Sequence, residues 1–261
     1  MLCGVATEAR RVLVLVVVLA SGFCASYARD WHHVNTTCPQ LVRCQCSVRK
    51  AGAIVLCRNV SQFQDLGPDM AMLQNVTVKK LSFDNVIIRE IPGDWFSNHT
   101  IHMLVVRNCP LRDIGEAAFT RMGRLFRLTI ENAHLESVPS GLSAASRLNS
   151  LRIHRNHIKF LKGVMKLPVL TVFDLRFNAI QTIDEKFLSA SPKLKYLVLS
   201  GNHIQHIPYR LLENTRRLKS VEFRDNRLTA ISSLLDGLRY LQVRYLSSKM
   251  PKKHTHMIKP M

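Results

Sequence analysis

The stretch LKYLVLSGNHIQHIP, from Leu194 to Pro208, decides the fold of this 261-residue chain. Counted from Leu194 as position 1, large apolar residues stand at positions 1, 4, 6, 11 and 14. The alternation around positions 4 and 6 has the period of a half-buried β-strand, and positions 11 and 14 return the chain over the same core. One unit of this length cannot bury its own apolar face, so the pattern predicts neighbours of the same kind.

The same pattern recurs at intervals of 22 to 24 residues and gives seven units, with a large apolar residue at all 35 pattern positions. The units begin at Val78, Ile101, Leu125, Leu148, Leu170, Leu194 and Leu218. A further apolar residue in each unit is expected to close the core on the far side: Phe96, Phe119, Leu142, Val164, Phe187, Leu212 and Leu235. Repeated units that share one core predict an α/β-type repeat solenoid with short parallel strands.

Position 9 of the unit carries a second signal, because units four to seven have asparagine there. These residues are Asn156, Asn178, Asn202 and Asn226. A buried asparagine can bond backbone groups of the turn through both its amide donors and its carbonyl, so we expect a ladder along the stack. Units one to three have Val86, Cys109 and Ala133 instead. Cys109 is therefore interpreted as a buried small hydrophobe rather than a reactive thiol.

The pattern stops in an eighth unit, which begins with Leu238, Leu241 and Val243. Polar Ser248 and then Pro251 follow at its next pattern positions, so the repeats are expected over 78–246 as seven units and one partial unit. Residues 247–261 are basic and poorly patterned, which predicts a disordered tail. Two interpretations stay open here: a naturally short secreted form, or a chain truncated relative to a longer receptor.

The first 28 residues have the pattern of a signal peptide. Arg10 and Arg11 precede the apolar run Val12 to Ala20, and Ser26-Tyr27-Ala28 offers small residues for cleavage. Nine apolar residues are too few to cross a hydrocarbon core that needs about 20, although an uncleaved anchor is the competing interpretation. The chain is therefore expected to be secreted, with no stable membrane span, or to stand at the cell surface if it is part of a longer receptor.

Cysteines and glycosylation sequons fit that route. Four cysteines, Cys38, Cys44, Cys46 and Cys57, lie within 20 residues and predict two disulfides in an N-terminal cap over 29–77. A zinc site is the competing interpretation, but the spacing lacks paired C-x-x-C knuckles, so we expect no metal. Four sequons, all before residue 101, predict glycosylation at Asn35, Asn59, Asn75 and Asn98.

These features resemble the extracellular leucine-rich repeat family over about Cys38 to Val243. Leu194 to Pro208 is similar to its consensus unit, CPQLVRCQC with Cys57 resembles its N-terminal cap, and the early units resemble secreted arthropod members. The resemblance implies a horseshoe with strands on its concave face and loops or short helical turns on its convex face. It also implies disulfides that pair Cys38 with Cys46 and Cys44 with Cys57. Members usually end in a second cysteine-rich cap, whereas no cysteine follows Cys109 here.

Composition and motifs argue against catalysis. Only 11 glycines are present, and no G-x-S-x-G, H-E-x-x-H or phosphate-binding glycine motif occurs. Ser200-Gly201-Asn202-His203 is contiguous within one repeat rather than drawn from separate blocks. The pairs His154/His157 and His203/His206 have metal-like spacing but are interpreted as exposed histidines. We therefore expect neither an enzyme nor a bound cofactor.

The charge of the chain bears on its partners. Lys and Arg total 37 against 18 Asp and Glu, a formal net charge of +19. Such an excess favours acidic partners in general, from sulfated glycans to acidic proteins. The informative surface is the concave sheet, made from positions 2, 3, 5, 7 and 8 of each unit, where Arg and Tyr are frequent carriers of binding energy.

The candidate binding residues on that face are Arg152, His154, Arg176, Tyr196, Arg224, Tyr240 and Arg244. Three acidic residues, Asp174, Glu222 and Asp225, interrupt the positive field, which tempers a simple polyanion interpretation. The sequence thus predicts a secreted protein that binds an extracellular protein ligand through its concave face and does not bind nucleic acid. The alternatives are a binder of glycosaminoglycans, the ectodomain of an adhesion or innate-immune receptor, or a merely solvated basic face.

Overall fold

The computed structural model describes residues 38–49, 52–229, 241 and 243–245. The predicted signal peptide, the sequon at Asn35, the candidate Tyr240, the apolar Leu235 and the tail over 247–261 lie outside the described residues.

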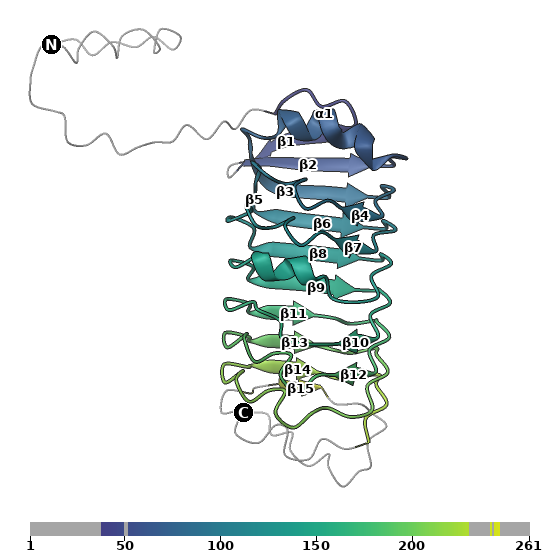
Figure 1. The fold of residues 1–261 in the computed structure, drawn as a ribbon, viewed down its shortest axis with the longest axis vertical. Helices are drawn as coiled ribbons and strands as arrows, with labels where there is room; N and C mark the ends of the chain where they lie inside the picture. The colour runs from purple at the N-terminus through teal and green to yellow at the C-terminus, as the bar shows by residue number, and fades with distance from the viewer. Residues whose placement is uncertain (1–37, 50–51, 230–240, 242, 246–261) are drawn as a thin grey trace, which may run out of the picture. The chain divides into compact units, whose positions relative to one another are not determined.

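The predicted parallel sheet is present and runs through every unit (Figure 1). It has eleven strands, of which ten follow one another as β1-β2-β3-β6-β8-β9-β11-β13-β14-β15, while β5 pairs with β3 beside β6. Only the pairing of β1 with β2 is antiparallel within this sheet. The strands are β1 (Cys44–Arg49), β2 (Gly52–Arg58), β3 (Thr77–Asp84), β5 (Thr100–Ile101), β6 (Met103–Arg107), β8 (Arg127–Glu131), β9 (Ser150–His154), β11 (Val172–Asp174), β13 (Tyr196–Val198), β14 (Ser220–Glu222) and β15 (Val243–Tyr245).

The strand register confirms the unit boundaries. Position 4 residues pair from strand to strand, as Leu104 does with Leu128 and Phe173 with Leu197. A one-residue slip would turn the apolar side chains out of the core, so this register follows from the apolar pattern. The connections outside the sheet are loops with two short parallel pairs, β4 (Glu90–Ile91) with β7 (Asp113–Ile114) and β10 (Phe160–Leu161) with β12 (Thr182–Ile183). One connection also contains the 3₁₀ turn η2 (Ser140–Ala144).

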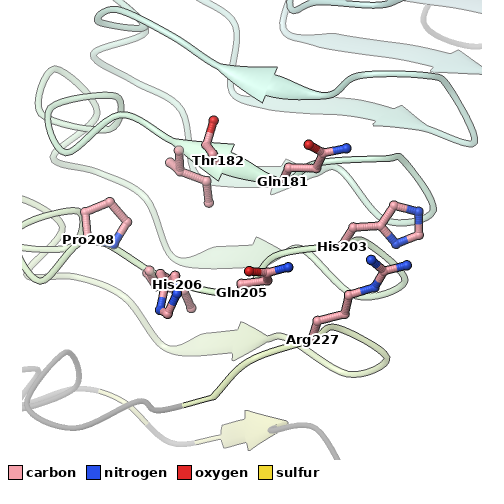
Figure 2. Close-up of a pocket in the computed structure, with 9 residues that line it drawn as sticks. Gln181, Thr182, His203, Gln205, His206, Pro208 and Arg227 are labelled. Atoms are coloured by element: carbon pink, nitrogen blue, oxygen red, sulfur yellow. The ribbon is translucent and has the colours of Figure 1, made fainter.

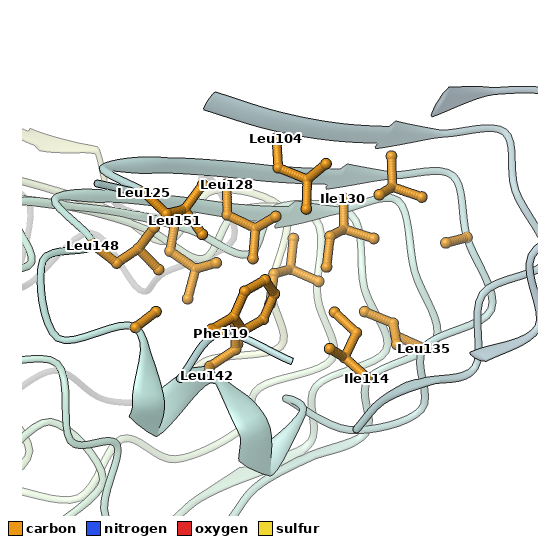
Figure 3. Packing of buried hydrophobic residues seen from close by; sticks show 14 of the residues in the cluster. Leu104, Ile114, Phe119, Leu125, Leu128, Ile130, Leu135, Leu142, Leu148 and Leu151 are labelled. Carbon is orange, nitrogen blue, oxygen red and sulfur yellow. The ribbon is translucent and has the colours of Figure 1, made fainter. Parts of the chain in front are cut away.

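The core is one continuous layer between the sheet and the connections, as Figure 3 shows for units two to four. All pattern positions are buried except Val138 and Ile207, which are partly buried, and Ile231, which lies outside the described residues. One prediction is wrong: Val164 is 43% exposed. Gly163 has a φ of 72° and turns the chain just before it, so that Met165 returns to the core in its place.

The asparagine ladder at position 9 is confirmed. Asn178 is buried, and its Oδ1 accepts from the N–H of Ile158 at 3.2 Å. Its Nδ2 donates to the carbonyls of Ile153 at 2.8 Å and Leu175 at 2.9 Å. Asn156, Asn202 and Asn226 are also buried, and each bonds backbone groups of its own unit and of the preceding one. Each asparagine therefore joins two units through backbone groups that would otherwise be buried without partners.

Cys109 stands in the corresponding place of unit two and is buried, with its Sγ 3.1 Å from the carbonyl oxygen of Arg107. Burial raises the pKa of the Cys109 thiol, outweighing the opposing effect of nearby backbone groups. A thiol held in its protonated form and out of solvent is unreactive. The prediction of a buried small hydrophobe is confirmed.

The N-terminal segment carries the two disulfides that the family resemblance implies, Cys38–Cys46 and Cys44–Cys57. The second links β1 to β2. The 3₁₀ turn η1 (Phe63–Leu66) and helix α1 (Gly67–Met72) follow β2 and cover the first turn of the core, into which Phe63 and Leu66 are buried.

Asp69 of α1 is fully buried and holds the entrance to β1. Its carboxylate accepts from the backbone N–H groups of Val42 at 2.7 Å and of Arg43 and Cys44 at 2.8 Å each. Three N–H donors on one carboxylate satisfy a charge that would be costly to bury alone. The helix is thereby tied to the strand that closes this end of the sheet.

The predicted register of the eighth unit is wrong. The sequence pattern placed Arg244 beside Arg224 at position 7, whereas the structure pairs Arg244 with Val221 and Val243 with Ser220. Register is specified by apolar side chains that must reach the core, and the eighth unit loses that pattern after Val243. Arg244 therefore does not continue the column of position 7 residues.

Candidate binding surface on the parallel sheet

The outward side of the parallel sheet, called the sheet face below, consists of positions 3, 5 and 7 of each unit. Successive side chains of a strand point to opposite sides, so the burial of positions 4 and 6 directs these residues away from the core. Strands about 4.8 Å apart place equivalent positions in columns that run along the stack. Any ligand of this face would therefore meet columns of side chains rather than a single pocket.

In the first units the position 7 column consists of opposite charges that pair with one another. Arg58 lies 3.7 Å from Asp84, and the Nε of Arg107 donates to Glu131 at 2.8 Å. The Nδ1 of His154, in the next unit, lies 3.9 Å from the same Glu131. The position 7 charges in this part of the sheet face are therefore paired with one another.

Asp174 does not lie on the surface as predicted, because it is 1% exposed. Arg176 covers it: the guanidinium Nε lies 2.9 Å from each carboxylate oxygen, Nη2 donates to Oδ2 at 2.6 Å, and the Arg176 N–H adds a bond of 3.1 Å. The hydrogen bond to Asp174 raises the pKa of Arg176 further above its ordinary value. The Arg176 side chain is still partly exposed, but its charge is already paired with that of Asp174.

His154 is a weaker candidate than its position suggests. The prediction of an exposed histidine is wrong here, because the side chain of His154 is 16% exposed. Burial is the main cause that lowers its pKa, with Arg176 and Arg155 acting in the same direction and with Glu131 and Asp174 opposing them. His154 is therefore mostly neutral near pH 7 and contributes little positive charge to the sheet face.

Two of the other described candidates, Arg152 and Tyr196, are more available. Arg152 is half-buried between its strand neighbours Thr129 and Asp174, and it forms neither an ion pair nor a side-chain hydrogen bond with the described part of the chain. Tyr196 is 43% exposed at position 3 of unit six, and Arg224 is exposed at position 7 of unit seven. The sheet face of units four to seven thus carries exposed Arg and Tyr side chains.

The residues at position 8, which the sequence predicted only to lie on the surface, share an unusual backbone conformation. At position 8 the chain leaves each strand with a positive φ, between 50° and 69°. We call this the edge column; its residues are Asn59, Asn85, Asn108, Asn132, Arg155, Phe177, Gly201 and Asp225. The four asparagines are exposed. Asn85 donates to Asn59 at 2.8 Å and Asn132 donates to Asn108 at 2.9 Å, while Asn108 donates to the Asp84 carboxylate at 2.9 Å. Their recurrence at one position was the sequence signal for this turn, since asparagine tolerates left-handed backbone.

One described hollow lies away from the sheet face, on the connections of units five to seven. It has a volume of about 520 Å³ and is lined by Gln181, Thr182, Ile183, His203, Gln205, His206, Ile207, Pro208 and Arg227 (Figure 2). His203 and His206 are both exposed, as the sequence interpretation held. No three His, Cys, Asp or Glu residues are grouped as metal ligands here or elsewhere among the residues that the structure describes.

Comparison with known proteins agrees with this geometry. The family model described as "Leucine rich repeat" matches residues 146–204. Acidic leucine-rich nuclear phosphoprotein 32 family member A of Drosophila melanogaster is 29% identical over 114 residues, which is 43% of each chain. Human Toll-like receptor 3 is 26% identical over 124 residues, which cover 44% of this chain and 14% of the receptor. The chain thus spans less than half the length of these relatives.

A solved structure shows the fold. An internalin from Listeria monocytogenes superposes with a TM-score of 0.59 at 22% identity, over 74% of this chain and 54% of the internalin. Within the described residues no helix is both long and apolar enough to cross a membrane. The repeat register, the buried asparagine ladder and these matches lead to one conclusion: the chain folds as a parallel β-solenoid of the leucine-rich repeat type.

Proposed function

We propose that this protein is a secreted, glycosylated, non-enzymatic member of the extracellular leucine-rich repeat family that binds a protein ligand through the sheet face of units four to seven. The observation that carries the proposal is the contrast along that face. The position 7 charges of the early units pair with one another, whereas further along Arg152 forms no ion pair with the described part of the chain and Tyr196 is 43% exposed. Arg and Tyr combined on one open face are typical of binding hot spots.

The N-terminal segment supports the secretory part of the proposal. Two disulfides near Asp69 and α1 are typical of proteins that fold in an oxidising compartment, and we interpret this segment as the cysteine-rich cap of a secreted arthropod-type member. The described sequon asparagines Asn59, Asn75 and Asn98 are all exposed.

Two of these sequons occupy equivalent places in successive units, because their threonines Thr77 and Thr100 are strand partners. Glycans on Asn75 and Asn98 would therefore stand side by side at the start of the sheet. That arrangement crowds units one and two and leaves the sheet face of the later units uncovered, which agrees with a ligand site there.

Two other functions have observations in their favour. The net charge of +19 favours a binder of sulfated glycans through Lys and Arg. The similarity to a protein named Toll-like receptor 3 favours the ectodomain of a longer receptor, in which the same face would still bind the ligand. We favour a protein ligand because Glu222 and Asp225 interrupt the positive charge of unit seven, while Asp174 pairs with Arg176 in unit five. We expect no nucleic-acid binding for the same reason.

Reversing the charge of Arg152 is expected to weaken capture of the protein ligand about tenfold or more, since a central interface Arg often contributes 1.4 kcal/mol or more. Arg152→Glu breaks no ion pair, although it places a carboxylate beside the strand partner Asp174, whereas Arg176→Glu would remove the guanidinium that covers buried Asp174. The matched control is Lys186→Glu, an exposed residue of the connection after β12.

The measurement is quantitative capture of proteins from the organism's extracellular fluid at about 0.15 M and about 1 M salt, with retention on a heparin column as the second readout. Loss in Arg152→Glu alone, present at both salt concentrations, supports the protein interface. The opposite result would be equally weakened capture by both variants at about 0.15 M salt, with no difference from wild type at about 1 M salt. If both variants also eluted earlier from heparin, the chain would be assigned to polyanion binding.

A further inference from the structure

Phe177 and Arg155 are adjacent members of the edge column, in units five and four, and both have left-handed backbone, with φ values of 55° and 57°. Such a backbone is unfavourable for a bulky side chain and is tolerated well by Gly, Asn and Asp. The other six places of the column hold only those residue types: four asparagines, Gly201 and Asp225. Folding alone would thus select Asn at both positions.

The left-handed backbone at these places is fixed by the sheet. The Phe177 N–H donates to the carbonyl of Ser200 at 2.9 Å, and the Arg155 N–H donates to that of Arg176 at 3.1 Å. Relaxing the dihedral angles would break these bonds between units. Conformational strain that a fold maintains without structural need is a mark of functional positions.

The Phe177 side chain is also displayed rather than buried. It is 49% exposed, and the Arg155 guanidinium lies 5.7 Å from its ring centroid. On the other side the ring occupies the space that a side chain at position 201 would need, because a Cβ built on Gly201 would lie 2.5 Å from the ring. The ring therefore lies between a cation and a bare backbone, held in place with about half its surface open.

From these observations we propose that Phe177 and Arg155 form the anchor for an acidic protein segment that carries a large apolar side chain; this inference rests on the proposed function of the sheet face. An open aromatic ring beside an Arg binds a large apolar group and a carboxylate together. The neighbouring position 5 column adds Arg152, which complements the charge of an acidic segment. A sulfated chain would match the charges but would supply no large apolar group for the ring.

The test uses the chain in its disulfide-bonded form and a phage library of random dodecapeptides. Phe177→Asn and Arg155→Asn introduce the residue that the fold itself uses at Asn59, Asn85, Asn108 and Asn132. The control is Tyr209→Asn, because Tyr209 is 65% exposed and has the Arg210 guanidinium 5.1 Å from its ring, in a connection outside the sheet.

We expect the wild-type chain to select acidic peptides that contain Phe, Leu, Ile, Met or Trp. These peptides should bind Phe177→Asn and Arg155→Asn at least about tenfold more weakly, and Tyr209→Asn with unchanged affinity. The melting temperature of both edge-column variants should equal or exceed that of wild type.

A melting temperature lowered by more than about 3 °C in Phe177→Asn would show that the ring serves packing, and would overturn the inference. Selected peptides without acidic residues, equal binding by all variants, or a failure to select any peptide would overturn it as well. If Arg152→Glu abolishes capture of the protein ligand while Phe177→Asn does not, the proposed function stands and only this anchor is wrong.

Discussion

Replacing Asp69 with alanine is expected to lower the free energy of unfolding by about 3–5 kcal/mol, the largest loss we expect from a single substitution. The carboxylate is completely buried and is the acceptor for three consecutive N–H groups at the entrance to β1. Without it those donors lose their partners, and the strand that closes the sheet loses its attachment to α1. Urea denaturation with the disulfides intact would measure the loss.

Two variants make this expectation specific. Asp69→Asn keeps one acceptor oxygen and should lose less stability than Asp69→Ala. Asp65→Ala removes a carboxylate from the same segment, but one that pairs with Arg43 only at 3.7 Å and is partly exposed, so its cost should stay within about 1 kcal/mol. Similar losses for Asp65→Ala and Asp69→Ala would contradict an anchoring role for Asp69.

Asn178→Ala is expected to cost roughly 1–3 kcal/mol, because it leaves buried backbone groups of two units without partners. The side chain bonds the N–H of Ile158 and the carbonyls of Ile153 and Leu175. Thermal unfolding followed by circular dichroism would detect a melting temperature lowered by several degrees.

Asn149→Ala is the control for that substitution. Asn149 lies one unit earlier on the exposed rim of the sheet and bonds Thr171 and Val169 where water can replace it. Its replacement should be nearly neutral. Equal effects of the two substitutions would mean that the assignment of position 9 is wrong.

Most of the fold could be predicted from the sequence because a single apolar spacing fixes the strands, the register and the core. Each strand has only one apolar face, formed by Leu128, Leu151 and their equivalents, and this face must be buried. The pairing of these residues from strand to strand therefore follows from the pattern. The buried asparagines were predictable for a related reason, since a polar residue that recurs inside an apolar repeat must satisfy backbone groups. The error at Val164 arose where Gly163 changes the path of the chain.

The candidate site was less predictable, because the availability of a charge depends on its neighbours in space. Nothing local distinguishes Asp174 from an exposed acidic residue, whereas in the structure it is buried beneath Arg176, two positions later. The role of Asp69 depends on β1, 25 residues earlier in the chain, and has no sequence signal. The edge column did have a sequence signal, because asparagine recurs at position 8 and is replaced by Arg155 and Phe177 in two consecutive units.

Site-specific photo-crosslinking would test most directly whether the sheet face is the binding surface. A benzoylphenylalanine would replace either Tyr196, which is 43% exposed on the sheet face, or Tyr209, which is 65% exposed in a connection outside the sheet. Each variant would be irradiated in the organism's extracellular fluid, and the adducts identified by mass spectrometry. We predict one discrete protein adduct at position 196 and none at position 209. An adduct at position 209 alone, or the same adducts at both positions, would contradict the account.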